Sequence, residues 1–236
     1  MTCGRSVHSQ KTSGQKHIQP IWYTNDYVEQ RNLLMSEALK KLQVKIGSSA
    51  DGSFGPNTAK AICNHYTLNP ERGAHFLGQL VHESGTFRYT EENLNYSTAS
   101  ILKVFGKYFD SESEAETCAR NPQALADRVY GHRYGNNGQG YLWRGRGFLQ
   151  CTFKENYAMF ANDMNLPEVM KDPDLVATDY PMESAIWFFK RNKLWDMCDV
   201  TPSSESVKAL TKRVNGGYNG LKHRQEETMK IYKWLV

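Results

Sequence analysis

Residues 82–97, HESGTFRYTEENLNYS, hold two glutamates, Glu83 and Glu92, nine positions apart. Before Glu83, apolar residues recur at every third or fourth position, which predicts an amphipathic helix. Asn69-Pro70 supplies an N-cap side chain and a proline at the first helical position, so the helix is expected to begin there. Gly85 is a residue type that commonly ends helices. The stretch therefore predicts one carboxylate in the last helical turn and a second in the following loop.

Two carboxylates held across a cleft are what acid/base cleavage of a glycosidic bond requires. On a straight helix nine residues would separate them by about 13–14 Å, whereas inverting hydrolysis needs about 6.5–9.5 Å. Gly85 lets the chain turn back, so the shorter distance is reachable. Apolar Phe76 and Leu80 beside Glu83 favour a raised pKa and a general acid, whereas the amides and hydroxyls around Glu92 favour an ionised base. Alone, the pair is weak evidence, because surface glutamates with this spacing are common.

Composition describes a polar globular protein. The 236 residues carry a net charge of +4, 39% are hydrophobic, and the mean hydropathy is −0.64. This length fits one domain with appendages or two small domains. The mild positive charge favours an anionic partner, such as a cell-wall polymer or nucleic acid, without selecting either. Five cysteines, odd in number and never in a CxxC pair, argue against a disulfide framework and a zinc site: Cys3, Cys63, Cys118, Cys151 and Cys198.

Several other chemistries are excluded by missing residues. His82-Glu83 could begin a zinc protease motif, but Thr86 stands where its second histidine is required. The sequence has neither a glycine-rich phosphate loop nor a G-x-S-x-G nucleophile elbow. Residues 1–20 contain no apolar core of a secretory signal, and no apolar run reaches the roughly 18 residues of a membrane span.

The first part of the chain divides into two segments. Residues 1–22 form a basic polar arm, to be understood either as a disordered tail or as a segment that becomes ordered against a partner. Residues 23–68 are predicted to be helical, with one helix over 28–46 and a second from the turn at 51–58 to about residue 66. The pattern between Leu39 and Ile62 resembles a partial peptidoglycan-binding repeat. The alternatives are wall binding and a helical brace for the next domain.

The sequence of the remaining chain predicts a mainly α protein with many loops. Further helices are expected over residues 97–108, 124–130, 153–164, 181–193, 204–214 and 221–235. Residues 131–147 are rich in glycine and arginine and are predicted to be a loop. The one candidate strand covers residues 148–152.

Five motifs follow one another in an order that identifies a resemblance. They are His82–Gly85, Glu92–Ser97, Arg144–Thr152, Asn156-Tyr157 and Arg213–Gly217. Together they resemble the family 19 glycoside hydrolases, in particular the short phage endolysins that carry this chitinase-like domain. The resemblance covers about residues 69–236. It implies a mainly α, lysozyme-like, two-lobed helical domain with a sugar-binding cleft, preceded by the short helical segment.

The resemblance also implies roles for individual residues. Glu83 corresponds to the general acid and Glu92 to the general base. Glu92 is chosen over Glu91 because the Asn-Leu-Asn-Tyr-Ser run follows it directly. Thr152 corresponds to the residue that holds the attacking water. The expected substrate-binding residues are Gln150, Asn156, Asn215, Arg224, Tyr141 and Trp143, with core packing an equal alternative for Trp143.

No metal and no cofactor is expected for this inverting reaction. The chain lacks the extra loops of the plant chitinases that it resembles, which implies a shorter, open groove. Such a groove suits the peptidoglycan of bacterial walls as substrate, with chitin as the alternative, and no nucleic acid partner is expected. A free enzyme of this kind is expected in the host cytoplasm until a holin-type pore releases it to the wall. Alternatively the protein belongs to the virion, tethered to tail proteins through its N-terminal arm.

Overall fold

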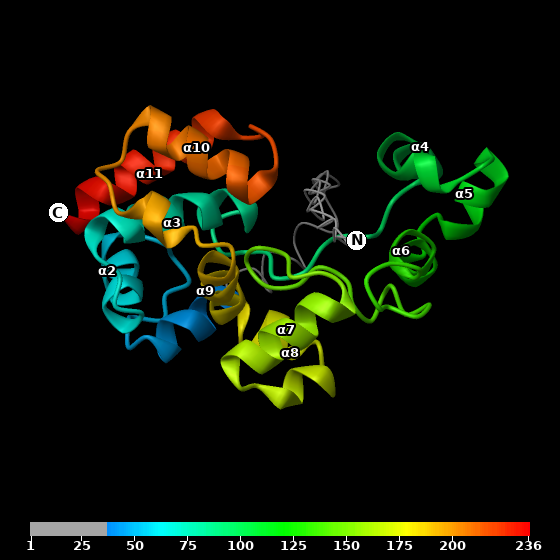
Figure 1. The fold of residues 1–236 in the computed structure, drawn as a ribbon, viewed down its shortest axis with the longest axis horizontal. Helices are drawn as coiled ribbons and strands as arrows, with labels where there is room; N and C mark the ends of the chain where they lie inside the picture. The colour runs from blue at the N-terminus through cyan, green and yellow to red at the C-terminus, as the bar shows by residue number, and fades with distance from the viewer. Residues whose placement is uncertain (1–36) are drawn as a thin grey trace, which may run out of the picture.

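The computed structural model describes residues 37–236, and their regular structure is entirely helical (Figure 1). The predicted arm at residues 1–22 lies outside the described residues, as does the first part of the helix predicted over 28–46. Residues 37–45 of that prediction are helical. The mainly α fold predicted from the sequence is therefore confirmed.

The helices follow one another along the chain without strands between them. The α-helices are α2 (Pro56–His65), α3 (Pro70–Glu83), α4 (Thr98–Phe105), α5 (Glu112–Cys118), α6 (Pro122–Tyr130), α7 (Lys154–Met164), α8 (Leu175–Thr178), α9 (Pro181–Arg191), α10 (Ser204–Asn215) and α11 (Leu221–Leu235). Short 3-10 helices are η1 (Gly106–Tyr108), η2 (Pro167–Met170) and η3 (Trp195–Cys198). The sequence predictions miss α5, α8, η2 and η3.

The central helix α3 has the ends that the sequence predicts. The Asn69 side chain accepts a hydrogen bond from the Arg72 amide at 2.8 Å, and Pro70 opens the helix. Residues 73–81 are all buried. At Gly78 a side chain would collide with Thr228 of α11, so glycine permits these two helices to pack closely. Glu83 thus stands at the end of a rigid, enclosed helix.

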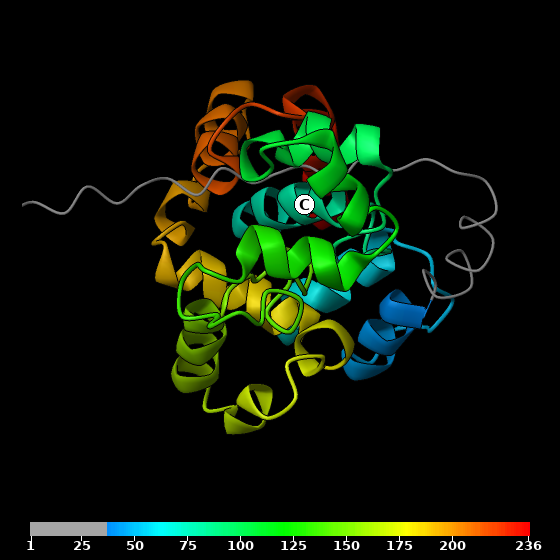
Figure 2. The ribbon, with the colours of Figure 1, turned by 90° about the vertical axis from the view of Figure 1, so that its right-hand side faces the viewer.

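The buried apolar side chains form three clusters. The largest joins α2, α3, α9, α10 and α11 into a first lobe, and the second lies among α4, α5 and α6, which form a second lobe (Figure 1). A third cluster, below α9, belongs to α7 and α8. Figure 2, viewed from the side of the second lobe, shows α4–α6 in front of the first lobe. The predicted two-lobed organisation is confirmed.

Residues 37–68 share the core of the first lobe. Leu39, Leu42 and Ile62 belong to the same buried cluster as α3 and α11. Glu183 of α9 pairs with Lys45 at 2.7 Å and accepts a hydrogen bond from the Tyr66 hydroxyl at 2.8 Å. This packing favours the helical brace over an independently folded wall-binding module.

The strand predicted at residues 148–152 is wrong. The chain there folds back on itself, because Gly147 and Gln150 have φ angles of +82° and +53°. The backbone of Arg146 exchanges two hydrogen bonds with that of Cys151, and only isolated bridges form. Among the described residues, the four cysteines are buried and free of disulfides.

Candidate active site

Glu83 is held by an arginine from the far end of the chain. Arg224, in the first turn of α11, has no exposed surface and donates a hydrogen bond from Nη2 to Glu83 Oε1. Its Nη1 donates to Gln79 Oε1 at 2.7 Å, and its Nε donates to the Asn219 carbonyl at 3.1 Å. The Glu83 side chain is 11% exposed. The expectation of mainly apolar surroundings for Glu83 is wrong, because the fold pairs its carboxylate with a guanidinium.

Glu92 lies in a loop, where a backbone amide and a phenol reach its two oxygens. The Gly145 amide donates to Oε1 at 2.6 Å, and the Tyr130 hydroxyl donates to Oε2 at 3.0 Å. Burial raises the pKa of Glu92, although both hydrogen bonds act to lower it. The sequence predicts a Glu92 that stays readily ionised in polar surroundings, and its burial works against that prediction.

Glu92, Gln150 and Thr152 converge on Gly145. A Cβ atom at Gly145 would lie 2.6 Å from Gln150 Oε1, 3.1 Å from Thr152 Oγ1 and 3.4 Å from Glu92 Cδ. Asn156 joins the group, because its Nδ2 donates to the Thr152 carbonyl at 2.7 Å. The structure therefore brings together Glu92, Gln150, Thr152 and Asn156, all of which the sequence predicts to be site residues.

A left-handed turn connects the two carboxylates. Gly85, Thr86 and Phe87 have φ angles of +58°, +65° and +60°, and only the first is glycine. The Ser84 hydroxyl accepts a hydrogen bond from the Phe87 amide at 2.7 Å, and the Phe87 ring is fully buried against Phe148. These contacts hold a conformation that is costly for residues with side chains. The turn redirects the chain from the α3 end toward Glu92.

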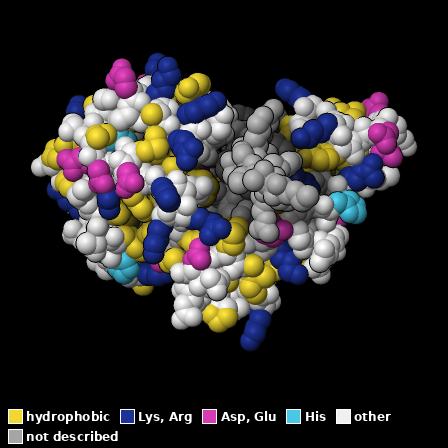
Figure 3. Space-filling view, in the orientation of Figure 1, with side chains coloured by type: hydrophobic (Ala, Val, Ile, Leu, Met, Phe, Trp, Pro, Cys, Tyr) yellow, Lys and Arg dark blue, Asp and Glu magenta, His cyan; other side chains and the backbone are white. Residues whose placement is uncertain are grey.

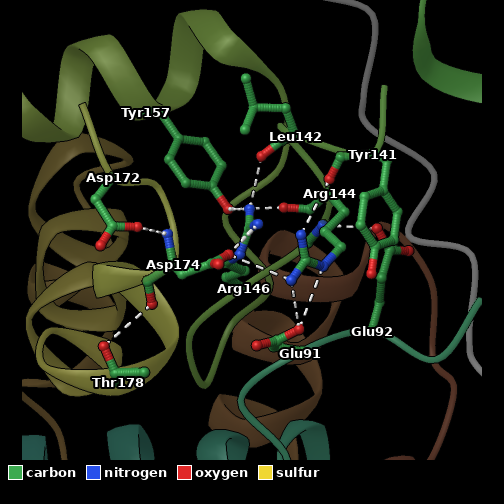
Figure 4. Close-up of polar contacts among 11 residues, drawn as sticks. Glu91, Glu92, Tyr141, Leu142, Arg144, Arg146, Tyr157, Asp172, Asp174 and Thr178 are labelled. Carbon is green, nitrogen blue, oxygen red and sulfur yellow. Dashed lines mark hydrogen bonds and ion pairs between the residues drawn. The ribbon is translucent and has the colours of Figure 1, made fainter. Parts of the chain in front are cut away.

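Two buried arginines fix the loop that carries Glu92 (Figure 4). Arg144 pairs with Glu91 at 2.8 Å and with Asp174 at 3.3 Å, and Arg146 also pairs with Asp174. The Arg146 Nη1 atom donates to the Tyr157 hydroxyl at 2.9 Å. Because Arg146 is 1% exposed, its role is to hold carboxylates and backbone in place rather than to contact a polymer. Glu91 therefore has a structural partner that Glu92 does not share.

The remaining predicted binding residues occupy different environments. Tyr141 is partly buried beneath the Arg144 guanidinium, 4.4 Å from the ring centre, and lines a hollow of about 500 Å³ with Glu91 and Glu92. Trp143 is 3% exposed and packs edge-on against Tyr157, so the core-packing alternative applies to it. Arg224 contacts Glu83 and has no exposed surface; the structure thus makes it a positioning residue and not a groove contact.

Among the described residues, two of the buried polar atoms without a hydrogen-bond partner belong to predicted substrate-binding residues. They are Gln150 Oε1 and Nδ2 of Asn215, the last residue of α10. An unsatisfied buried polar atom is costly unless a ligand or water completes it. Both atoms are therefore suited to hydrogen bonds with the amide and hydroxyl groups of a sugar.

His82, next to Glu83, faces a second histidine. The Nδ1 atoms of His82 and His223 lie 3.1 Å apart, and the His82 ring packs closely on Gly220. Burial lowers the pKa of His82 to about 4, and the charge of Arg224 adds to this effect. Among residues 37–236 no group of three or more metal-binding side chains gathers.

Sequence reasoning misses Tyr130 and Gly145, which form the immediate environment of Glu92. Tyr130 ends α6 without any motif around it, and Gly145 stands among alternating arginines and glycines in a predicted loop. Only their convergence in space reveals their roles. No helix in the described part of the chain is long and apolar enough to cross a membrane.

Three known proteins are similar to this chain over 147 to 177 residues. No protein-family model matches the chain. A Haemophilus influenzae protein described as a glycosyl hydrolase family 19 domain-containing protein is 36% identical over 177 residues, which cover 72% of this chain and 80% of that protein. Two endochitinases of Arabidopsis thaliana are 30% and 31% identical over 147 residues, 61% of this chain. The matches span 39% and 38% of those longer proteins.

Proposed function

Because the chain belongs to glycosyl hydrolase family 19 and is a glycoside hydrolase, we propose that it is a lysozyme of the phage endolysin type. Its substrate is the β-1,4 glycan of bacterial peptidoglycan. The observation that carries the proposal is the pair of differently held carboxylates: Glu83 on the Arg224 guanidinium, and Glu92 among Gly145, Tyr130 and Thr152.

In the proposed mechanism, Glu83 protonates the leaving oxygen of the glycosidic bond while Glu92 takes a proton from the attacking water. The Thr152 hydroxyl, gathered with Glu92 around Gly145, orients that water. The water attacks the face opposite the leaving group, so the anomeric configuration inverts. The chain's own side chains supply every proton transfer in this scheme.

The two carboxylates have different surroundings in the free protein. The Arg224 guanidinium donates a hydrogen bond to the Glu83 carboxylate, and burial raises the pKa of Glu92. In the proposed reaction Glu83 enters protonated and Glu92 enters ionised, with the Gly145 and Tyr130 hydrogen bonds stabilising the charge of Glu92.

Two variants test this division of roles. An aryl glycoside with a good leaving group needs little protonation, so Glu83→Gln should retain activity on it while losing activity on the natural polymer. Glu92→Gln should lose activity on both the aryl glycoside and the natural polymer. Azide should restore activity to this second variant and give a product of inverted configuration. The matched control is Glu91→Gln, because Glu91 is the chain neighbour but pairs with Arg144. Equal loss in all three variants, or a product of retained configuration, would contradict the mechanism.

Chitin is the second candidate substrate, favoured by the name endochitinase of the two Arabidopsis relatives. Peptidoglycan is supported by the resemblance of the five motifs between His82 and Gly217 to the short phage endolysins. Parallel assays on purified murein and on chitin oligosaccharides decide between them. A higher kcat/KM on chitin oligosaccharides, with no release of murein fragments, would select the second candidate.

The biological setting is also part of the proposal. The enzyme would accumulate in the cytoplasm of an infected host, and a holin-type pore would admit it to the wall. A second setting places it in the virion, with residues 1–22 attached to tail proteins. Mass spectrometry of purified virions and of fractionated cells before lysis distinguishes them, because only the second setting puts the protein in the particle.

A further inference from the structure

Positive charge is concentrated in two segments of the chain. Residues 206–225 contain five cationic side chains and no acidic one: Lys208, Lys212, Arg213, Lys222 and Arg224. The whole chain has a net charge of +4, so everything outside this segment sums to −1 (+4 − 5). Residues 93–109 likewise contain Lys103 and Lys107 and no acid. Arg224 is buried on Glu83, and Lys222 lies 3.9 Å from Glu226. The exposed cations of residues 206–225 that can attract anions are therefore Lys208, Lys212 and Arg213.

Two of the lysines on α10 lie over an exposed aromatic ring. Tyr218 is 51% exposed, and the Nζ atoms of Lys208 and Lys212 lie 5.5 and 5.3 Å from its ring centre. Lys212 Nζ also donates to the Gly216 carbonyl at 3.1 Å. Within residues 37–236, no carboxylate forms an ion pair with Lys208, Lys212 or Arg213. The cations are therefore ordered over the ring but not neutralised.

This surface adjoins the catalytic acid. Tyr218 precedes Asn219, whose carbonyl accepts a hydrogen bond from Arg224, the partner of Glu83. Figure 1 places the α10–α11 connection at the edge of the first lobe that faces α4. Figure 3 shows Lys and Arg side chains over this part of α10 and others over α4 on the second lobe.

A neutral glycan does not account for such a surface, because directional hydrogen bonds and stacking suffice to hold sugar rings. We propose that Lys208, Lys212, Arg213 and Tyr218 form a binding surface for the carboxylates of peptide stems attached to the glycan strand. This inference deepens the proposed function and rests on it. The lysines attract the carboxylates, and the exposed Tyr218 ring packs against the stem. The surface gives the enzyme a preference for the substituted, anionic strand over chitin.

The test compares two double variants on an inactive background. Lys208→Gln/Lys212→Gln removes the surface charge, and Lys190→Gln/Lys193→Gln removes two exposed cations at the end of α9 as the matched control. Both carry Glu83→Gln, so that binding to purified murein is measured by co-sedimentation without turnover. The first variant should bind about tenfold more weakly, with a shallower salt dependence, and the control should bind like its parent.

Chemical treatment of the murein identifies the anion. An amidase releases the peptide stems and leaves a lactyl carboxylate on each muramic acid. On this stem-free strand the first variant and its parent should bind equally, and a difference that persists would assign the surface to the carboxylates of the glycan itself. Hydrofluoric acid, which removes wall-linked phosphate polymers but leaves the stems, should preserve the tenfold difference. Loss of the difference after hydrofluoric acid would assign the surface to phosphate and overturn the assignment to stems.

Chitin oligosaccharides supply the last comparison, because they are neutral. Binding of these sugars, measured by calorimetry, should not change in Lys208→Gln/Lys212→Gln. Equal weakening on chitin and murein, or equal weakening in the control variant, would overturn the proposal. Failure of the proposed function looks different: the active protein would then release no murein fragments, whatever the binding data show.

Discussion

The buried guanidinium of Arg224 donates a hydrogen bond to Glu83, although the two residues are 141 positions apart in the chain. Its other nitrogens bind Gln79 and the Asn219 carbonyl, so α3, α11 and the loop before α11 meet at one side chain. The position of the Glu83 carboxylate is therefore determined by the packing of the first lobe rather than by the active-site loop.

Arg224→Lys should impair catalysis more than stability. Lysine keeps the charge but cannot reproduce the three directed hydrogen bonds, so Glu83 should lose its fixed position. We expect kcat/KM to fall about 100-fold, the scale of a misplacement near 1 Å, and the free energy of unfolding to fall by about 2 kcal/mol. Steady-state kinetics and denaturant unfolding measure both. Arg191→Lys, at an exposed position at the end of α9, is the control and should change neither.

Tyr130→Phe should shift the acid limb of the pH–rate profile to higher pH. The Tyr130 hydroxyl stabilises ionised Glu92, so its removal raises the pKa of Glu92 further. A general base works when deprotonated, and the enzyme should therefore need a higher pH for activity. The profile of kcat/KM against pH measures the shift. An acid limb that stays in place or moves to lower pH would exclude Glu92 as the base.

Gly145→Ala should disable the Glu92 side of the site. The added methyl group would lie 2.6 Å from Gln150 Oε1 and 3.1 Å from Thr152 Oγ1, so these side chains must move away from Glu92. We expect at least about a 100-fold loss of kcat/KM. Gly106→Ala is the control, because open space surrounds Gly106 and its φ is −48°. The control should keep full activity and be more stable by about 0.4–1 kcal/mol. Similar activity in the two variants would refute the arrangement around Gly145.

His82 should make the protein less stable as the pH falls from 6.5 to about 4. The folded protein keeps His82 neutral down to a pKa of about 4, whereas the unfolded chain binds its proton near pH 6.5. Protonation therefore favours unfolding within this window. After allowance for solvent screening of a partly exposed ring, we expect about 1–2 kcal/mol. Urea unfolding of the wild type and His82→Gln at pH 7 and pH 4 measures the difference. Equal losses in both proteins would show that His82 makes no such contribution.

Local sequence signals predict the long helices but not the short ones. Asn69-Pro70 and Gly85 mark the ends of α3 because capping is a property of neighbouring residues. The segments of α5 and α8 have only seven and four residues, too few for an apolar period to appear. The electrostatics of the carboxylates depend on Arg224, Tyr130 and Gly145, which are distant in the chain.

The candidate site was predictable only in part for the same reason. Paired carboxylates with nearby amides and hydroxyls indicate a glycosidase, and the order of the motifs indicates which of them gather. Successive side chains in an extended loop point to opposite sides, and here Glu91 binds Arg144 while its neighbour Glu92 faces Tyr130. The sequence cannot show which of the two glutamates takes which side. The burial of Trp143 and Arg224 likewise follows from tertiary packing.

Mass spectrometry of the fragments released from purified murein tests the central claim most directly. The wild type should release muropeptides whose new reducing ends identify a cleaved β-1,4 bond. Glu83→Gln should release none while it remains folded, although its unfolding midpoint should fall, because the buried Arg224 guanidinium loses its carboxylate partner. Muropeptide release by Glu83→Gln at the wild-type rate would contradict the account, and so would a wild-type digest that contains no cleaved glycan.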